Sequence, residues 1–244
     1  MKTVTKSLLI IFVIFLFPAS LSLAWWYFAD RPQSWRNADW GSSGLLPPAS
    51  ENKEAVIHVM AARTGGLKGA LSVHSWIVTK RKGQARYDRY DKVGWGRPVR
   101  KNEFPADGLW YSNEPFFVKT VRGIEAERLI PEVETAIESY MASFPNGYRL
   151  WPGPNSNSFV AHVLREVTQL DAILPSNAVG RDYLAGSGIT VDRDGRDYHL
   201  SLFGLAGVAF GLRSGFEVHL LGLVAGIDVL RPGIKIPAIG RVGL

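Results

Sequence analysis

The chain has 244 residues, a net charge of +6 and 46% hydrophobic residues. A chain of this length buries enough apolar surface to fold without disulfides. It contains no cysteine, which excludes thiol nucleophiles and thiolate metal sites.

The N-terminal segment is first basic and then apolar. Two lysines stand among the first six residues, and the apolar run Ser7 to Ala24 follows. Export machinery recognises this order, so we expect the folded part outside the cytoplasm. Cleavage after Ala24 would release it. However, Trp25 to Phe28 extend the run to a length that spans a bilayer, with aromatic rings at the interface. We therefore favour an uncleaved membrane anchor formed by residues 1–28. Membrane lipid is then an expected partner.

A linker and a single domain are expected next. Residues 29–53 are rich in Pro, Ser, Gly and Asn, as in a spacer, and the domain is expected to comprise residues 54–244. Apolar patterns predict strands at Ala55–Ala62, Leu71–Lys80, Ala85–Val93 and Phe116–Arg122. Apolar residues at three- and four-residue spacing predict helices at Pro131–Phe144, with Pro131 in the first turn, and at Ser158–Leu170.

The last quarter of the domain is rich in glycine and apolar residues. Between Tyr198 and Ile236 a faint repeat pairs Ala-Gly with a later Leu-Arg-x-Gly. Charges at Arg213, Glu217 and Asp228 interrupt this region, so it contains no spanning helix. The pattern predicts Gly-rich β-hairpins that close a small sheet or barrel.

The segment from Lys80 to Lys101 carries nine Lys or Arg residues against two Asp. Such a segment is either a solvated strand-and-loop face or a surface that attracts anionic lipid or an anionic cell-wall ligand. Nucleic acid is not an expected partner of an exported chain. The histidines show no metal-ligand spacing, so the sequence predicts no metal and no cofactor.

Three segments carry the candidate chemistry. His74 lies in the second predicted strand, Arg86–Tyr90 form a polar strand, and Asn155–Phe159 open a helix. A nucleophilic Ser156 at a helix start would gain from the backbone N–H groups there, which stabilise an oxyanion. His74 would accept its proton, and Asp88 on the neighbouring strand is the best residue by type to orient the imidazole.

Polar and aromatic residues around this site are candidates for binding: Asn155, Asn157, Tyr87, Tyr90 and Trp151. Trp95 and Trp110 are further candidates to line a cleft. A purely structural interpretation stays open. In it, Asn155–Ser158 is a cluster of helix-capping residues with Ser158 as the expected cap, and His74 is a hydrogen-bonded core histidine.

The order of these parts resembles the circularly permuted papain-like hydrolases, which include the permuted NlpC-type amidases, the lecithin–retinol acyltransferase relatives and the PPPDE-type isopeptidases. In those families a helix begins Asn-Cys-x-x-Phe, and the Cys is the nucleophile. This chain reads Asn155-Ser156-Asn157-Ser158-Phe159, so Ser156 stands where the family has Cys. The resemblance implies an α+β fold, with a small antiparallel sheet or barrel packed with a few helices. An alcohol is a weaker nucleophile than a thiol, so both a serine enzyme and a catalytically silent relative fit the pattern.

A second resemblance rests on the run Trp-Pro-Gly-Pro-Asn-Ser-Asn-Ser-Phe-Val-Ala-His at residues 151–162 and on the tail Leu220 to Gly243. Both resemble a bacterial envelope family known only as a domain of unknown function. This implies a single-pass inner-membrane protein with a periplasmic domain, or a periplasmic protein after cleavage. This resemblance supplies no activity. The candidate site leaves two functions open: a hydrolase or acyltransferase that acts on an amide or ester, or a non-catalytic protein that binds peptide, glycan or lipid.

Overall fold

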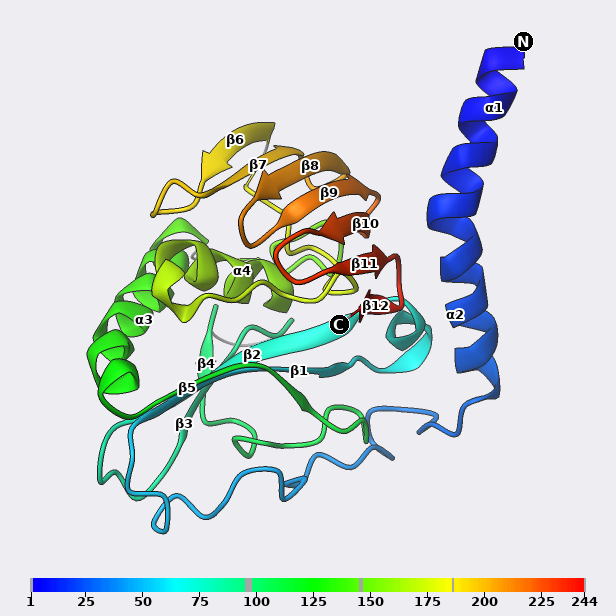
Figure 1. Cartoon of the computed structure of the whole chain (residues 1–244). Coiled ribbons are helices and arrows are strands. Elements are labelled where there is room, and N and C mark those ends of the chain that lie inside the picture. Colours follow the sequence, from blue (N-terminus) through cyan, green and yellow to red (C-terminus); the bar gives the residue numbers. More distant parts are fainter. Residues whose placement is uncertain (1, 95–97, 145–146, 186, 244) are drawn as a thin grey trace.

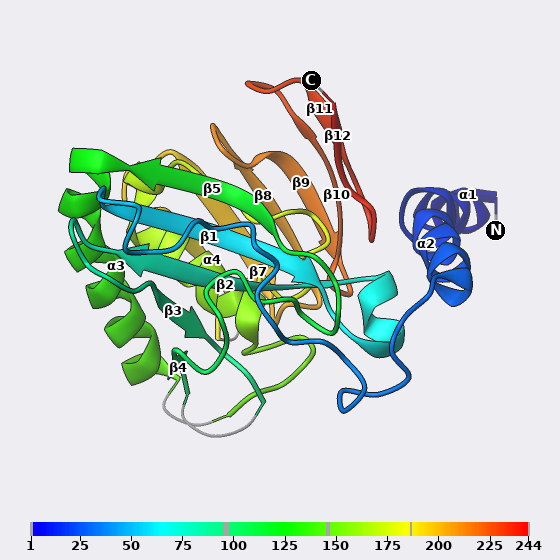
Figure 2. The same cartoon turned by 90° about the horizontal axis from the view of Figure 1, so that it is seen from below.

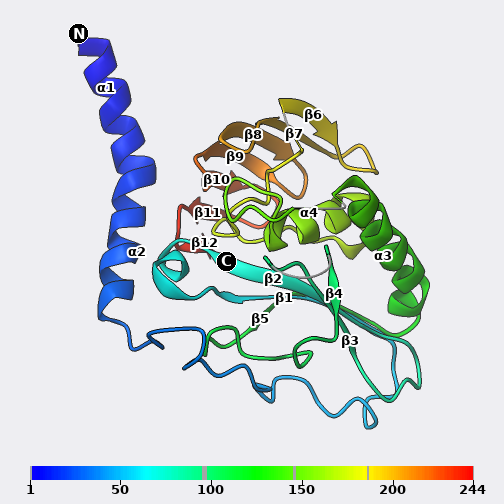
Figure 3. The same ribbon diagram turned by 180° about the vertical axis from the view of Figure 1, so that it is seen from behind.

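Two antiparallel sheets with helices packed between and beside them form the folded part of the chain, and a long N-terminal helix stands next to it (Figure 1). The computed structural model describes residues 2–94, 98–144, 147–185 and 187–243. Helix α4 (Ser156–Glu166) lies between the sheets, and α3 (Gly123–Ser143) flanks one side of the same layer (Figure 3). The predicted α+β class, with antiparallel sheets and few helices, is therefore confirmed.

The first sheet has five strands in the order β4-β3-β2-β1-β5, and the larger of them run side by side across one face of the molecule (Figure 2). Their bounds are β1 (Val56–Arg63), β2 (Val73–Lys80), β3 (Asp88–Asp91), β4 (Arg100–Lys101) and β5 (Phe116–Arg122). All four predicted strands are present. β3 is shorter than predicted because residues 81–87 form the connection from β2.

Helix α3 begins at Gly123, well before the predicted start at Pro131. The helix follows β5 directly, and the Gly123 N–H donates to the Ala55 carbonyl at 2.8 Å, which ties the helix start to the residue before β1. Leu129 and Ile130 are fully buried, so the apolar stripe continues upstream of the proline. Pro131 therefore lies inside the helix, where it removes one helical hydrogen bond, and the packing of α3 on the first sheet outweighs this loss.

The second sheet is an open meander of seven strands in the order β12-β11-β10-β9-β8-β7-β6. Its strands are β6 (Ser187–Val191), β7 (Asp197–Leu202), β8 (Ala206–Gly211), β9 (Gly215–Leu220), β10 (Leu223–Asp228), β11 (Gly233–Ile236) and β12 (Gly240–Gly243). The predicted hairpins are present, and of the two predicted alternatives, a small sheet or a barrel, the structure has an open sheet. The repeat marks only the central hairpins, whereas β6, β7 and β12 extend the same meander and leave β6 and β12 at opposite edges.

The N-terminal helix consists of α1 (Lys2–Ile11), a π-helical stretch η1 (Phe12–Leu16) and α2 (Phe17–Phe28). It is long and apolar enough to span a membrane, as a signal sequence also can be. Its end packs on the 3₁₀ turn η2 (Gly66–Ala70), where the indole of buried Trp26 donates to the Gly66 carbonyl at 2.8 Å. The helix is thus attached to the folded part at the point where it ends.

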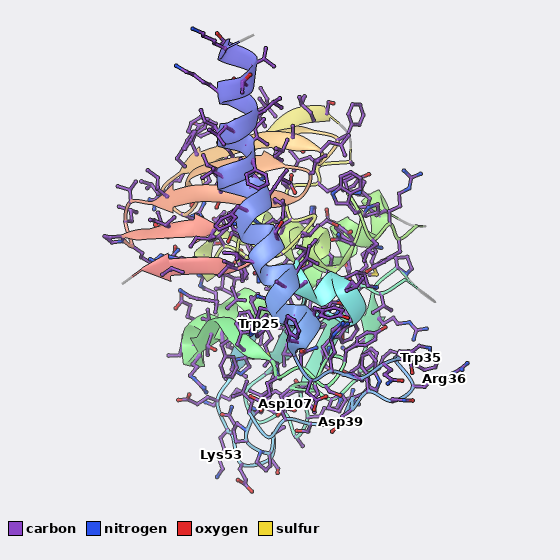
Figure 4. All side chains as sticks on the ribbon, turned by 90° about the vertical axis from the view of Figure 1, so that its right-hand side faces the viewer. Trp25, Trp35, Arg36, Asp39, Lys53 and Asp107 are labelled. Atoms are coloured by element: carbon purple, nitrogen blue, oxygen red, sulfur yellow. The ribbon has the colours of Figure 1, made fainter. Side chains whose placement is uncertain are left out.

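The segment that follows this helix packs along the first sheet. The ring of Trp40 lies 5.1 Å from Trp110 and 4.6 Å from Tyr111. The Asp107 carboxylate accepts from the Ser42 hydroxyl at 2.7 Å, and Asp39 lies nearby (Figure 4). Residues 29–53, predicted as a spacer, therefore contribute an apolar anchor and several hydrogen bonds to the domain.

Candidate active site

A cavity of about 290 Å³ lies between the end of η2, the start of α4 and the turn between β9 and β10. Five of the predicted site residues line it: His74, Trp151, Asn155, Ser156 and Asn157. They come from β2, from the loop before α4 and from the first turn of α4. The fold therefore brings together segments that are some 80 residues apart in the chain, as the hydrogen bond between Ser75 and Asn157 also shows.

Ser156 is the first residue of α4, and Asn155 is its N-cap. The Ser158 N–H donates to Asn155 Oδ1 at 3.0 Å, and the Asn155 N–H donates to Ser158 Oγ at 2.9 Å. The expectation that Ser158 is the cap is wrong. Asn155 has the extended backbone that the capping position requires, and Ser158 completes the capping box three residues later.

The Ser156 hydroxyl differs from the other polar side chains of this turn. It has no hydrogen-bond partner among the residues that the structure describes, although the residue is only 4% exposed. The backbone N–H groups of Ser156 and Asn157 precede the first donor of the helical hydrogen-bond ladder. A polar ligand atom in the cavity would therefore meet a hydroxyl and two N–H groups at the positive end of a helix.

Asn155 and Asn157, predicted as binding residues, use their side chains to hold this turn in place. The Asn157 amide donates to the carbonyls of Val73 and Val179, both at 2.9 Å, and its Oδ1 accepts from Ser75 Oγ at 2.8 Å. The Asn155 amide also donates to the Val179 carbonyl, at 3.0 Å. Asn157 thus joins the start of α4 to β2 beside His74. Its contacts show that it positions the first turn of α4.

His74 is oriented by Asp91 and not by the predicted Asp88. Nε2 of His74 lies 2.9 Å from Asp91 Oδ1, and the Asp91 carboxylate also accepts from Arg89 Nε at 2.6 Å. All three side chains are at most 4% exposed. The imidazole stacks on the indole of Trp110, with ring centroids 3.6 Å apart and nearly parallel planes. The ring is therefore fixed on one edge by a carboxylate and on one face by an aromatic plane.

Charges in this buried group set its protonation. Burial would raise the pKa of Asp91, but the Arg89 guanidinium and the hydrogen bond from His74 outweigh it and lower that pKa to about 2. Burial lowers the pKa of His74 below its ordinary value, although Asp91 opposes this. At neutral pH the carboxylate is ionised and the imidazole is neutral. Nε2 then carries the hydrogen that Asp91 accepts, and Nδ1 keeps a lone pair.

The other predicted residues lie apart from the cavity. Asp88 contacts Gln84, Asn102 and Lys101 on the opposite face of β3. The hydroxyl of Tyr87 donates to the Pro47 carbonyl at 3.1 Å, and Tyr90 is buried in the core of the first sheet. The reason is the register of β2 and β3, which pairs Val78 with Arg89. Arg89 and Asp91 therefore share the face of His74, while Asp88 and Tyr90 share the other.

Of the predicted cleft tryptophans, Trp151 lines the cavity, Trp110 stacks behind His74, and Trp95 lies outside the described residues. Many of the basic side chains between Lys80 and Lys101 make contacts within the protein. Lys80, Arg89 and Lys92 are buried, Lys92 Nζ donates to the Pro98 carbonyl, and Lys101 contacts Asp88. Arg97 lies outside the described residues.

A protein-family model described as "Protein of unknown function (DUF3750)" matches residues 54–183. The match covers β2 and the start of α4, which line the cavity, and it ends before the second sheet, whose residues Leu221 and Leu223 also contribute to the cavity wall. The tail from Leu220 to Gly243, included in the resemblance noted for the sequence, lies beyond it. Neither the curated proteins nor the solved structures contain a significant match to this chain.

Proposed function

We propose that this chain, which belongs to the DUF3750 family of proteins of unknown function, is a membrane-anchored serine hydrolase or acyltransferase that acts on an acyl ester or amide. The observation that carries the proposal is the common cavity of His74 and Ser156, with His74 held by Asp91. The order of these parts along the chain is the one that suggested a permuted papain-like organisation, and the proposal includes that organisation.

The proposed first step forms an acyl-enzyme. Nδ1 of His74 accepts the hydroxyl proton of Ser156 as Oγ attacks the acyl carbon. The backbone N–H groups of Ser156 and Asn157 stabilise the oxyanion that develops on the former carbonyl oxygen. The intermediate then collapses, the bond to the leaving alcohol or amine breaks, and His74 returns its proton to that group.

The second step releases the acyl group. His74 takes a proton from water, or from an acceptor alcohol in a transferase, and the resulting oxygen nucleophile attacks the ester carbon. Ser156 leaves with the proton from His74, which restores the starting state. Asp91 stabilises the imidazolium that exists between the two transfers. Among the described residues no hydrogen bond joins Ser156 to His74, and the proposed mechanism requires the two groups to approach when substrate occupies the cavity.

The cavity favours an apolar acyl group. Leu71, Leu150, Val179 and Leu223 contribute to its wall, together with the ring of Trp151. Apolar walls with a few convergent polar groups are typical of small-molecule sites. The polar groups of the proposed reaction lie on β2 and at the start of α4, so the acyl chain would contact the leucines while the carbonyl faces α4.

We place the site on the periplasmic side of the inner membrane. The basic start of the chain is expected to stay in the cytoplasm, and the helix Lys2–Phe28 would carry the remainder across. Protease added to spheroplasts is expected to digest the domain. Digestion only after the membrane is permeabilised would contradict this location.

The decisive assay compares two serine variants of the full chain, reconstituted in vesicles, on 4-nitrophenyl esters of increasing acyl length. Ser156→Ala is expected to lower turnover at least about 100-fold while the free energy of unfolding changes by less than about 1 kcal/mol. Ser72→Ala is the matched control, since Ser72 lines the same cavity but its hydroxyl donates to the Val73 carbonyl at 3.0 Å. Wild-type turnover in Ser156→Ala would overturn the proposal.

A second candidate is a non-catalytic protein that binds an anionic amphiphile in the same cavity. The observation that favours it is Lys68, which lies in an otherwise largely apolar wall. In this case a fluorescent fatty acid binds to the wild type and to Ser156→Ala with equal affinity, Lys68→Gln binds it more weakly, and no ester is turned over.

A further inference from the structure

The second sheet has reversed polarity. In β9, Phe216 and Val218 are exposed, whereas Glu217 and His219 are at most 5% exposed. In β7, Tyr198, Leu200 and Leu202 point outward, and Asp197 and Ser201 are buried. A sheet that faces water on one side has the opposite alternation, with apolar residues inside and polar residues outside.

The outward apolar side chains form a continuous row across the whole sheet. Pairing from strand to strand connects one residue of each strand: Val191, Tyr198, Phe210, Phe216, Ile227, Ile234 and Val242. We call these seven the outer row. Every member is at least 40% exposed, and none carries a charge. Soluble monomers rarely expose a contiguous apolar surface of this extent, so the outer row requires a cover.

The turns between the strands add to this surface. Turn residues are usually polar. Here Phe203, Leu212, Leu221 and Leu230 stand in four successive turns of the meander, and each is at least 50% exposed. Aqueous solvent gives no reason to place large apolar side chains at these positions.

The inward face is polar, and its charged groups form ion pairs with one another, so the reversal is built into the sheet. The Glu217 carboxylate accepts from both Arg181 and Lys235, and Lys235 Nζ also donates to the Ser214 carbonyl at 2.6 Å. Asp197 Oδ1 accepts from the Ser214 N–H at 2.7 Å. Burial would raise the pKa of Glu217, but these cations hold it well below its ordinary value. The charged groups therefore pair within the protein, which frees the outer row to meet an apolar medium.

We propose that the outer row lies against the lipid bilayer that the N-terminal helix enters. The helix runs across the outward side of this sheet (Figure 4), and close to β10–β12 in Figure 1. Its middle section η1 contacts β10, and Phe15 in that section is buried. The apolar face is thus continuous with the membrane-spanning candidate. The alternation, apolar outward and polar inward, is the one that lipid-facing strands adopt.

The proposal depends on the helix entering the membrane and does not depend on Ser156 being a nucleophile. Contact of the outer row with the bilayer would also place the cavity near the membrane, because Leu223 of β10 and Leu221 in the turn before it contribute to the cavity wall. A substrate with an acyl chain would then reach the cavity from the bilayer surface.

The absence of cysteine allows a direct test with single-cysteine variants of the full chain. Phe210→Cys and Ile227→Cys place an environment-sensitive fluorophore on the outer row. Ile124→Cys is the control, since Ile124 is 91% exposed at the start of α3, beside the first sheet. Each variant is reconstituted in phosphatidylcholine–phosphatidylglycerol vesicles, with lipids that carry a nitroxide on the acyl chain as quenchers.

Labels on the outer row are expected to emit at shorter wavelength than the control label and to be quenched at least about twofold more by the lipid nitroxide, as for side chains inside the apolar region. Quenching by aqueous iodide equal to that of the Ile124 label would overturn the proposal, because the face would lie in water. Blue-shifted labels that the lipid nitroxide does not quench would also overturn it, since a second protein surface would then be the cover. Two outer-row sites are used so that one misfolded variant leaves the test intact.

Discussion

In the first sheet the side chains that face α3 and α4 are apolar, whereas in the second sheet many of the side chains that face inward are charged. Ile57 and Ile77 exemplify the first pattern, and Glu217 and Lys235 the second. The first sheet is stabilised by apolar burial, and the second by buried ion pairs beneath an apolar outer surface. The proposed chemistry thus belongs to the first sheet, and the proposed membrane contact to the second.

Breaking the inner ion pairs should have the largest effect. Glu217→Ala leaves Arg181 and Lys235 buried without their carboxylate, so the free energy of unfolding is expected to fall by about 3–5 kcal/mol. Denaturant titration of the full chain in detergent micelles measures it. The control is Glu134→Ala, whose pair with Arg81 is about a third exposed and worth at most about 1 kcal/mol. A similar small loss in both variants would contradict the contrast between the sheets.

Substitutions at the carboxylates of β3, in the first sheet, should change the turnover of ester substrates. Asp91→Asn removes the charge that stabilises the His74 imidazolium, and we expect ester turnover to fall at least about 100-fold. Asp88→Asn changes the neighbouring carboxylate on the other face of β3 and should leave turnover near that of the wild type. Steady-state kinetics of the two variants distinguishes these roles. Equal losses in both would show that Asp91 has no special part.

Acidification should destabilise the first sheet. Burial lowers the pKa of His58 to about 4, and it also lowers that of His74. The unfolded chain therefore binds protons more readily than the folded chain as pH falls below about 6.5. The stability contribution of these neutral histidines is complete above that pH and is lost between about 6.5 and 4. His219 has a raised pKa and acts in the opposite direction, at the second sheet.

Thermal unfolding of the wild type and of His58→Gln at pH 7 and pH 5 measures this effect. The variant should show the smaller loss on acidification, because it lacks one of the groups that become protonated on unfolding. An identical pH dependence of stability in both proteins would show that His58 does not contribute to the loss on acidification.

Substitutions in the outer row should have little effect on the free energy of unfolding in micelles. Phe216→Ser exchanges an exposed side chain, and its inward neighbours keep their ion pairs, so the free energy of unfolding is expected to change by about 0.5 kcal/mol or less. A loss of several kcal/mol would place Phe216 in a protein core.

The sequence predicts those elements whose periodicity is clear, and it fails where tertiary pairing decides. β1, β2 and β5 follow from apolar runs, and the start of α4 lies within two residues of its prediction. The sequence points to Asp88 and does not reveal Asp91, because the register of β2 and β3 depends on the turn between them, and a shift by one residue exchanges the faces of β3.

Two further features were hidden in the same way. The alternation Phe216-Glu217-Val218-His219 is visible in the sequence, but a period of two does not say which face is inside. The early start of α3 was missed because Pro131 usually marks a first turn, and the buried contacts of Leu129 and Ile130 outweigh that preference. The cavity itself arises from contacts across the chain that no local pattern encodes.

Covalent labelling identifies the nucleophile of the proposed reaction without a known substrate. The full chain in vesicles is treated with a fluorophosphonate, and its peptides are mapped by mass spectrometry. We expect one adduct per chain, on Ser156, which is lost in Ser156→Ala, strongly slowed in His74→Gln and retained in Ser72→Ala. No adduct, or an adduct on another serine, would contradict it.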